Sequence, residues 1–214
     1  MNYSYALPYI QKDRVKQIFE LGARDCHDSV ALYKEFGCPV YAFECNPDGL
    51  ALCRETLKGT HNIELIEKAV TTYDGTTTFY PFDLTKDSNL GASSLFKHKS
   101  AFNLQKEITV PCCRLDTFMA ERGVTPDLLC MDIQGGELAA LQSMGPVLRD
   151  VTYIATECSV EGFYEGSYTF RDIYTYLTDN GFELTESGYL PAEIADFLNG
   201  YTWGIKEMDV LFER

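Results

Sequence analysis

Short apolar runs alternate with helical patterns along this chain of 214 residues. The first run reaches Ile18 and Phe19, and the chain then turns at Gly22. After Asp25 the apolar residues take a helical spacing, which places four of them on one face: Val30, Leu32, Tyr33 and Phe36. A strand, a glycine turn and a helix N-terminus together favour a ligand site, because the first N–H groups of a helix have no partner within it.

A second strand–helix unit follows the first. Residues 40–43 form an apolar run that ends at Glu44, and Asn46 with Pro47 predicts the start of a helix that continues to about Leu57. An acid at the end of the second strand is where nucleoside-binding α/β folds hold a ribose. Because one carboxylate can accept hydrogen bonds from both ribose hydroxyls, the two units predict an adenosine cofactor site.

The rest of the chain continues this alternation. Further strands are predicted at residues 62–67, extended by 68–70, and at 108–112, 127–133, 151–155, 182–184 and 209–212. Helices are predicted at residues 115–121, 137–144 and 170–179. Strands that alternate with helices favour a Rossmann-like α/β fold, in which a mostly parallel sheet carries helices on both faces.

Three segments depart from the alternation. Asp74 and Gly75 lie between residues of high strand propensity, which predicts a small β-hairpin. Residues 84–104 are rich in Ser, Asn, Lys and Gly without any period, which predicts a mobile loop. Residues 1–14 are typical of a polar lead-in that packs a few aromatic side chains against the body. We expect residues 15–214 to form one domain, because no linker or repeat divides them.

Acidic residues end several of the predicted strands: Glu20, Glu44, Asp132 and Glu157. The carboxyl ends of parallel strands share one edge of a sheet, and in open α/β sheets that edge carries the ligand crevice. We therefore expect these acids to lie around one ligand site.

Composition narrows the choice of partners and compartment. The net charge of −14 disfavours a nucleic-acid substrate, because an acidic surface repels phosphates. No apolar run reaches the roughly 18 residues of a membrane span, and the polar N-terminus is no signal peptide, so we expect a cytoplasmic protein. The eight cysteines lie mostly in apolar runs without a C-x-x-C pair, which favours reduced thiols over disulfides or structural zinc.

Two classes of adenosine cofactor compete for the predicted site. A nicotinamide-dependent dehydrogenase needs a G-x-G-x-x-G turn, whereas this turn offers only Gly22 and places Asp25 and Asp28 where a diphosphate would lie. S-adenosylmethionine carries a sulfonium and an ammonium instead, and nearby carboxylates stabilise both cations. The turn therefore favours S-adenosylmethionine.

The sequence resembles the FkbM-type S-adenosylmethionine-dependent methyltransferases. The resemblance covers nearly all of the chain after about residue 15 and keeps the order of its blocks. It is carried by ELGARDCHDS, YAFECNPDGLALCRETL, NIELIEKAV, GASSL, VPCCRLDTFM, PDLLCMDIQGGELAALQSMG, TECSVEGFYEGSYTF and YLTDNGFEL. The most specific blocks are MDIQGGELAALQ and EGFYEG.

This resemblance implies a class I methyltransferase fold with a seven-stranded sheet, and O-methylation of a small acceptor such as a sugar, glycolipid or polyketide. It implies these donor contacts: Glu20, Gly22, Ala23, Asp25, Ser29, Glu44, Cys45, Asn46, Lys68, Ala69 and Asp132. It implies these acceptor contacts: Ser93, Ser94, Glu161, Phe163 and Tyr164. Some have simpler interpretations, since Gly22 serves the turn, Asn46 caps the next helix, and Ser93 and Ser94 belong to a loop.

One departure from the family pattern concerns the first turn. Family members commonly show D-x-G-A-N-x-G, whereas Arg24 and Cys26 occupy the Asn and second Gly positions here. A bulkier turn could shift the methionine end of the donor, so a non-catalytic nucleoside-binding module is a further hypothesis.

Asp132 is the predicted centre of the chemistry, with Glu157 as a second catalytic acid. An ordinary Asp, with a pKa of about 3.9, is a weak base at neutral pH, so we expect Asp132 to orient the acceptor hydroxyl more than to deprotonate it. Glu137 is expected to cap its helix and to interact favourably with the helix dipole at the N-terminus. A magnesium site shared by these three acids is the alternative, although no metal is predicted. Lys97 and His98 are alternative bases.

Overall fold

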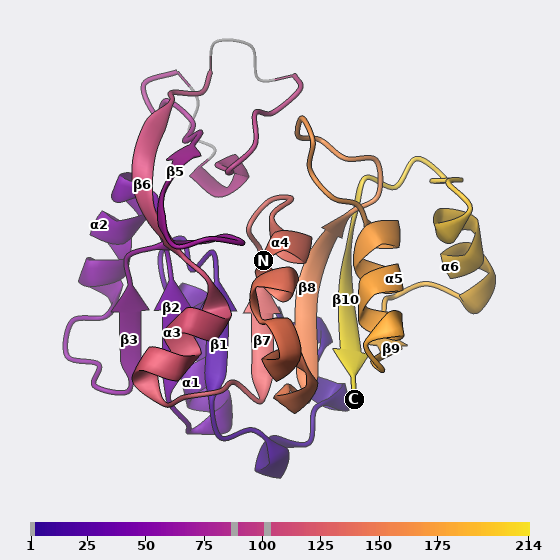
Figure 1. Ribbon diagram of the computed structural model, residues 1–214, viewed down its shortest axis with the longest axis horizontal. Helices are drawn as coiled ribbons and strands as arrows, with labels where there is room; N and C mark the ends of the chain where they lie inside the picture. Colours follow the sequence, from indigo (N-terminus) through magenta and orange to yellow (C-terminus); the bar gives the residue numbers. More distant parts are fainter. Residues whose placement is uncertain (1–2, 87–89, 101–103) are drawn as a thin grey trace.

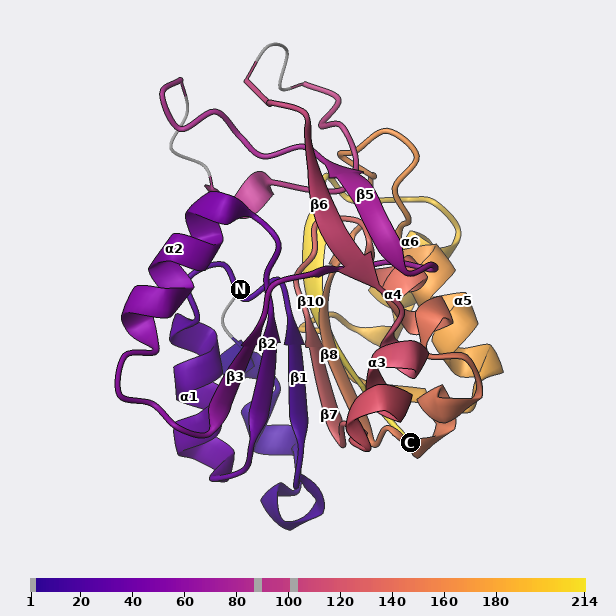
Figure 2. The ribbon, with the colours of Figure 1, turned by 60° about the vertical axis from the view of Figure 1, so that its left-hand side comes forward.

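A central sheet with helices on both faces forms the body of the protein (Figure 1, Figure 2). The computed structural model describes residues 3–86, 90–100 and 104–214. The seven strands lie in the order β3-β2-β1-β7-β8-β10-β9. Their bounds are Ile18–Leu21 (β1), Val40–Phe43 (β2), Ile63–Ile66 (β3), Leu128–Met131 (β7), Tyr153–Ser159 (β8), Glu183–Glu186 (β9) and Glu207–Glu213 (β10). Only β10 runs antiparallel to its neighbours among these pairs, which confirms the predicted mostly parallel fold.

The helices cover the sheet in two layers. Their bounds are His27–Phe36 (α1), Pro47–Thr56 (α2), Leu115–Arg122 (α3), Glu137–Ser143 (α4), Phe170–Asp179 (α5) and Pro191–Leu198 (α6). Figure 2 shows α1 and α2 on one face of the sheet and α3, α4 and α5 on the other. Helix α6 was not predicted, although Pro191 in its first turn and Gly200 beyond its end are typical helix boundaries.

Neighbouring residues of the central strands feed two separate apolar cores. Leu128 and Tyr153 pack with α1 on one face, whereas Leu129 and Ile154 pack with α3, α4 and α5 on the other. Successive side chains of a strand point to opposite faces, so a strand that is covered on both faces must be apolar throughout. This explains why β7 is an unbroken apolar run.

The strand register brings the predicted site residues together. Leu21 at the end of β1 pairs with Phe43 of β2 and with Met131 of β7. The three strands therefore end at the same level, and the turns that follow them meet at one edge of the sheet.

A second, three-stranded sheet corrects two predictions. It consists of β4 (Ala69–Val70), β5 (Gly75–Phe79) and β6 (Ile108–Cys113) in the order β4-β6-β5. Residues 68–70 do not extend β3, because β4 leaves the main sheet and pairs with β6. The predicted hairpin at Asp74 and Gly75 is also wrong, because β6 lies between β4 and β5 and pairs with both. The Asp74 carboxylate instead accepts a hydrogen bond from the Arg114 N–H at 3.0 Å.

The N-terminal lead-in packs against the sheet through three 3₁₀ turns: Tyr3–Tyr5, Leu7–Tyr9 and Lys12–Arg14. Tyr3, Ala6 and Ile10 are buried in the same core as α1. The Tyr5 hydroxyl donates to the Val210 carbonyl at 3.0 Å. The expected packing of lead-in aromatics against the body is therefore confirmed.

The segment predicted as a mobile loop, residues 84–104, includes residues 87–89 and 101–103, which lie outside the described residues. Its described part contains a 3₁₀ turn, Leu90–Ala92, and isolated bridges join Tyr80 to Ser94 and His98 to Tyr164. Its mobility stays a prediction. Across the described ranges, no helix is both long and apolar enough to span a membrane.

Candidate active site

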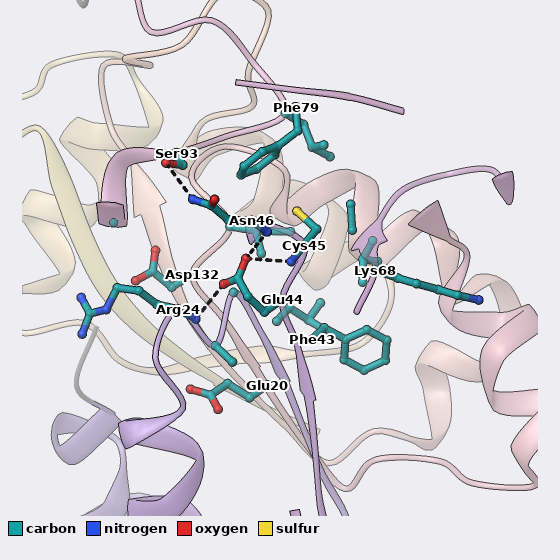
Figure 3. Close-up of a pocket in the computed structure, with 18 of the residues that line it drawn as sticks. Glu20, Arg24, Phe43, Glu44, Cys45, Asn46, Lys68, Phe79, Ser93 and Asp132 are labelled. Carbon is teal, nitrogen blue, oxygen red and sulfur yellow. Dashed lines mark hydrogen bonds between the residues drawn. The ribbon is translucent and has the colours of Figure 1, made fainter. Parts of the chain in front are cut away.

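A pocket opens at the carboxyl ends of β1, β2 and β7, where the acids were expected (Figure 3). The empty space within it, with its open mouth included, is about 810 Å³. Many of the predicted residues line it: Glu20, Gly22, Ala23, Glu44, Cys45, Asn46, Lys68, Ala69, Ser93 and Asp132.

Further lining residues were not predicted as contacts: Tyr3, Leu21, Arg24, Asp28, Phe43, Val70, Phe79, Leu90, Gly91, Leu95 and Ile133. Several belong to the lead-in, the second sheet and the loop before β6, which only tertiary contacts bring to the main sheet. Arg24 and Asp28 could have been found, because they flank the turn that the sequence identifies.

Other predicted residues lie outside the pocket wall: Asp25, Ser29, Ser94, Glu157, Glu161, Phe163 and Tyr164. The Asp25 carboxylate accepts the His27 N–H at 3.1 Å. The Ser29 hydroxyl is completely buried and donates to the Glu20 carboxylate in a very short hydrogen bond. Their predicted donor contacts stay predictions.

The first turn depends on a glycine and on two unusual backbone conformations. A Cβ at Gly22 would lie 2.0 Å from the Asp132 carbonyl oxygen, so only glycine fits. Arg24 and Cys26 have φ values of 53° and 59°, in the left-handed region. These positions carry Asn and Gly in the family pattern, and both of those residues adopt this region readily.

Most backbone N–H groups of this turn already have acceptors within the protein. N–H groups with acceptors inside the protein belong to Gly22, Ala23, Arg24, Cys26 and His27. The Phe43 carbonyl accepts two of them, each at 2.9 Å, and the Glu44 carboxylate accepts the Arg24 N–H at 2.8 Å. The turn is thereby tied to the end of β2.

Glu44 is fixed by backbone amides on both of its oxygens. Besides Arg24, the N–H groups of Cys45 and Asn46 donate to it at 2.7 and 2.6 Å. Burial raises the pKa of Glu44, although these hydrogen bonds oppose the shift. Since a carboxylate has about four lone-pair positions, roughly one remains for a ligand. The Asn46 side chain caps α2 by accepting the Asp48 N–H at 3.2 Å.

Glu20 is buried within β1, with 2% of its surface exposed, although it lines the pocket. Burial raises its pKa well above the ordinary value, and the hydrogen bond from Ser29 opposes that rise. A carboxyl group in this setting is more easily protonated than one at the surface.

Gln134 joins the two predicted catalytic acids. Its side-chain amide donates to Asp132 at 2.7 Å and to Glu157 at 2.8 Å, and its amide oxygen accepts the Tyr164 hydroxyl at 2.7 Å. Its φ of 54° is left-handed. The predicted site missed Gln134, although the MDIQGGELAALQ block contains it.

Glu157 lies inside β8, opposite Asp209 of β10, and not beyond the strand end as predicted. Burial, followed by the charges of Asp132, Glu207 and Asp209, raises the pKa of Glu157 to about 8. A carboxylate with a pKa near neutral is well suited to exchange protons with a substrate.

Glu137 stabilises the turn after β7. Its carboxylate accepts the N–H groups of Ile133 and Gly135, both at 3.0 Å, and burial raises its pKa to about 7. It therefore serves the start of α4, as expected, and does not line the pocket. Within residues 3–86, 90–100 and 104–214, no group of three or more His, Cys, Asp or Glu side chains could hold a metal ion.

Two of the predicted acceptor residues, Ser94 and Tyr164, contact Gln134, whereas the Glu161 carboxylate accepts the Thr202 hydroxyl at 3.1 Å. The Ser94 hydroxyl donates to the Gln134 carbonyl at 2.7 Å, and the Tyr164 hydroxyl also lies 3.0 Å from the Ala92 carbonyl. His98 stacks on Phe163 with ring centroids 6.0 Å apart. Gln134 thus connects the loop that lines the pocket with the segment that contains Tyr164.

Comparison with known proteins agrees with this geometry. The Methyltransferase FkbM domain matches residues 20–184. The 2-O-methyltransferase NoeI of Sinorhizobium fredii (strain NBRC 101917 / NGR234) is 28% identical over 171 residues, which cover 75% of this chain and 70% of that protein.

Solved structures of methyltransferases share the fold. The ribosomal protein L11 methylase from Lactobacillus delbrueckii subsp. bulgaricus aligns over 99% of this chain and 76% of its own, with a TM-score of 0.53 and 10% identity. Aeropyrum pernix fibrillarin with natively bound S-adenosyl-L-methionine aligns over 92% of this chain and 66% of its own, with a TM-score of 0.52 and 12% identity. At these identities the likeness shows the fold alone.

Proposed function

The chain belongs to the FkbM methyltransferase family, whose donor is S-adenosyl-L-methionine, and from this premise we propose that it methylates a hydroxyl of a small acceptor, namely a sugar, glycolipid or polyketide. The name of the 2-O-methyltransferase relative supports oxygen as the methylated atom. The observation that carries the proposal is the pair Asp132 and Glu157, which one amide joins beside the pocket. A hydroxyl nucleophile must lose a proton, and a sulfonium donor cannot take it.

The pocket suits this donor. Figure 3 shows Asp132 on one side of Glu44 and Phe43 on the other, with Phe79 above them. Carboxylates on the first side stabilise a sulfonium and an ammonium, and the apolar side accommodates an adenine. S-adenosylmethionine supplies an electrophilic methyl group on sulfur. Gly22 packs against the Asp132 backbone, which brings the turn after β1 close to the end of β7 at the pocket.

The residues divide the remaining work between them. Asp132 orients the acceptor hydroxyl, because it lines the pocket at the end of β7. Glu157 accepts the proton, because its pKa of about 8 matches the working pH of most enzymes. Gln134 holds both carboxylates in place, which reduces the entropy lost on reaching the reactive geometry.

The net charge of −14 supports a small acceptor over a nucleic acid, because a phosphate backbone would be repelled. The left-handed Arg24 and Cys26 favour one competing hypothesis, a nucleoside-binding module without catalysis. A nicotinamide dehydrogenase has no comparable support.

A transfer assay separates these functions. The protein is incubated with methyl-labelled S-adenosylmethionine and panels of glycan and polyketide acceptors, and the methylated atom is located by mass spectrometry and NMR. We expect an O-methyl product. Methylation of nitrogen or carbon would overturn the acceptor proposal, and donor binding without transfer to any acceptor would favour the binding module.

A further inference from the structure

The first turn offers few amides to an anionic ligand. In many α/β nucleotide sites a helix N-terminus binds anions through N–H groups that lack partners. Here five of the six residues from Gly22 to His27 donate their N–H groups to acceptors within the protein. Of these six N–H groups, that of Asp25 is left for a ligand, so a cationic side chain is the stronger partner for an anion beside the turn.

The donor presents such an anion. The methionine part of S-adenosylmethionine carries a carboxylate as well as its two cations. The carboxylates of Asp28 and Asp132 line this side of the pocket, and they repel an incoming carboxylate although they attract the cations. A cation must offset this repulsion for the whole methionine part to bind.

Arg24 is the cation in the right place. Among the described pocket-lining residues, the other basic side chain is Lys68, which Figure 3 shows on the far side of Glu44, extending away from Asp132. Arg24 contacts Asp25 only loosely, with Nε 3.6 Å from Oδ2, and its side chain is 45% exposed. That distance is longer than a well-formed hydrogen bond, so its guanidinium can turn to a ligand at little cost.

The backbone conformation of Arg24 also supports a role in ligand binding. A left-handed conformation is strained for a non-glycine residue, and Asn tolerates it better than Arg does. The Arg24 N–H is tied to Glu44, and a Cβ at Gly49 would lie 2.8 Å from the Arg24 carbonyl oxygen. A rigid backbone thus presents a long cationic side chain where a smaller residue would be less strained, and such strain often marks a functional position.

We propose that Arg24 binds the carboxylate of the donor's methionine part, in place of the amides that the turn has withdrawn. A guanidinium can make two parallel hydrogen bonds to a carboxylate, which fixes both its position and its direction. The inference rests on the donor site proposed above and is independent of the acceptor.

The test compares two ligands by calorimetry. S-adenosylhomocysteine contains the amino-acid part, whereas 5′-methylthioadenosine lacks it. We expect Arg24→Ala to weaken S-adenosylhomocysteine about 10- to 100-fold, as for a charged hydrogen bond, and to change 5′-methylthioadenosine less than about 3-fold. Arg24→Lys should recover part of the loss. Arg24→Asn should lose the affinity yet raise the melting temperature, because Asn suits the left-handed backbone.

Two further variants, Lys34→Ala and Glu44→Ala, serve as controls. Lys34→Ala, at the far end of α1, changes the net charge equally and should leave both affinities unchanged. If Arg24→Ala weakens both ligands equally, the residue only shapes the turn and the proposal is overturned. If Arg24→Ala leaves S-adenosylhomocysteine unchanged while Glu44→Ala weakens it, the proposal fails and the donor site stands. If neither variant weakens it, the donor site itself is wrong.

Discussion

Two neighbouring strand–turn–helix units provide acceptors for the N–H groups of their turns in different ways. The turn between β1 and α1 gives its N–H groups to Phe43 and Glu44 of the next strand, whereas the turn between β7 and α4 gives its N–H groups to Glu137 of its own helix. Each turn places a polar residue in the left-handed region, Arg24 in the first and Gln134 in the second.

The difference lies in what those residues are free to contact. Gln134 bridges Asp132 and Glu157, whereas the Arg24 side chain, within the described part of the chain, has a loose contact with Asp25. When a turn satisfies its amides internally, its side chains take over recognition. Under the proposals above, the second turn serves the acids and the first turn serves the donor, and the following substitutions test that division.

The largest effect is expected at Asp132. Asp132→Asn keeps the shape and the hydrogen bond to Gln134 but removes the charge, so the transfer rate should fall by about 10²–10⁴. The affinity for S-adenosylhomocysteine should change only a few-fold. Initial rates and calorimetry on the same preparation check both. Full activity would remove any chemical role from Asp132, and activity lost in EDTA but restored by magnesium would replace it with metal binding.

Glu137 should matter for stability and not for recognition. Glu137→Ala leaves the buried N–H groups of Ile133 and Gly135 without their acceptor, so the free energy of unfolding should fall by about 2–4 kcal/mol. Glu137→Gln retains an acceptor oxygen and should cost less. Urea denaturation measures both. Equal stability of all three proteins would mean that the second turn does not depend on its own helix.

Glu44 is the corresponding position for the first turn. Glu44→Ala should weaken S-adenosylhomocysteine by about 2–3 kcal/mol, because it removes a charged acceptor that the amides hold in place. Glu55→Ala removes an exposed acid from α2 and serves as the control. A dissociation constant unchanged by Glu44→Ala would move the ribose site elsewhere.

The smallest effect concerns proton affinity at Glu157. Because only the ionised carboxylate accepts a proton, the rate should rise about tenfold per pH unit up to about pH 8 and then level off. The free energy of unfolding should instead fall as the pH rises. The folded pKa lies above the unfolded value, so the stabilisation is fully present below the unfolded pKa and is lost as pH rises through about 8.

Glu157→Gln provides the comparison for both measurements. It should flatten the pH–rate profile and the pH dependence of the melting temperature between about pH 5 and 8. If the substituted protein keeps the wild-type profile, another group titrates, and His98 is the next candidate.

The sequence predicted the parts of the site that are local. The first strand, Gly22 and the position of Glu44 follow from spacing within a few tens of residues, because each belongs to one strand–turn–helix unit. The second sheet could not be predicted in the same way. Ala69 pairs with Cys112, and no local period records a pairing at that separation.

Side-chain roles were harder to predict than positions. Gln134 lies in a block that the sequence singled out, but its role depends on a left-handed backbone and on a carboxylate from β8. Tyr3 lines the pocket from a lead-in that resembled a polar tail. Both facts arise from packing between distant segments, which a single sequence does not reveal.

The Cys45 thiol can report chemically on whether the pocket is occupied. Seven of the eight cysteines are buried, whereas Cys45 is partly exposed and lines the pocket beside Glu44. Burial raises its thiol pKa, so alkylation should be slow and should accelerate at alkaline pH. A ligand that fills the pocket should shield this sulfur, so the mass increase of one peptide would measure occupancy in the unmodified protein. Ligands could then be ranked before any acceptor is known.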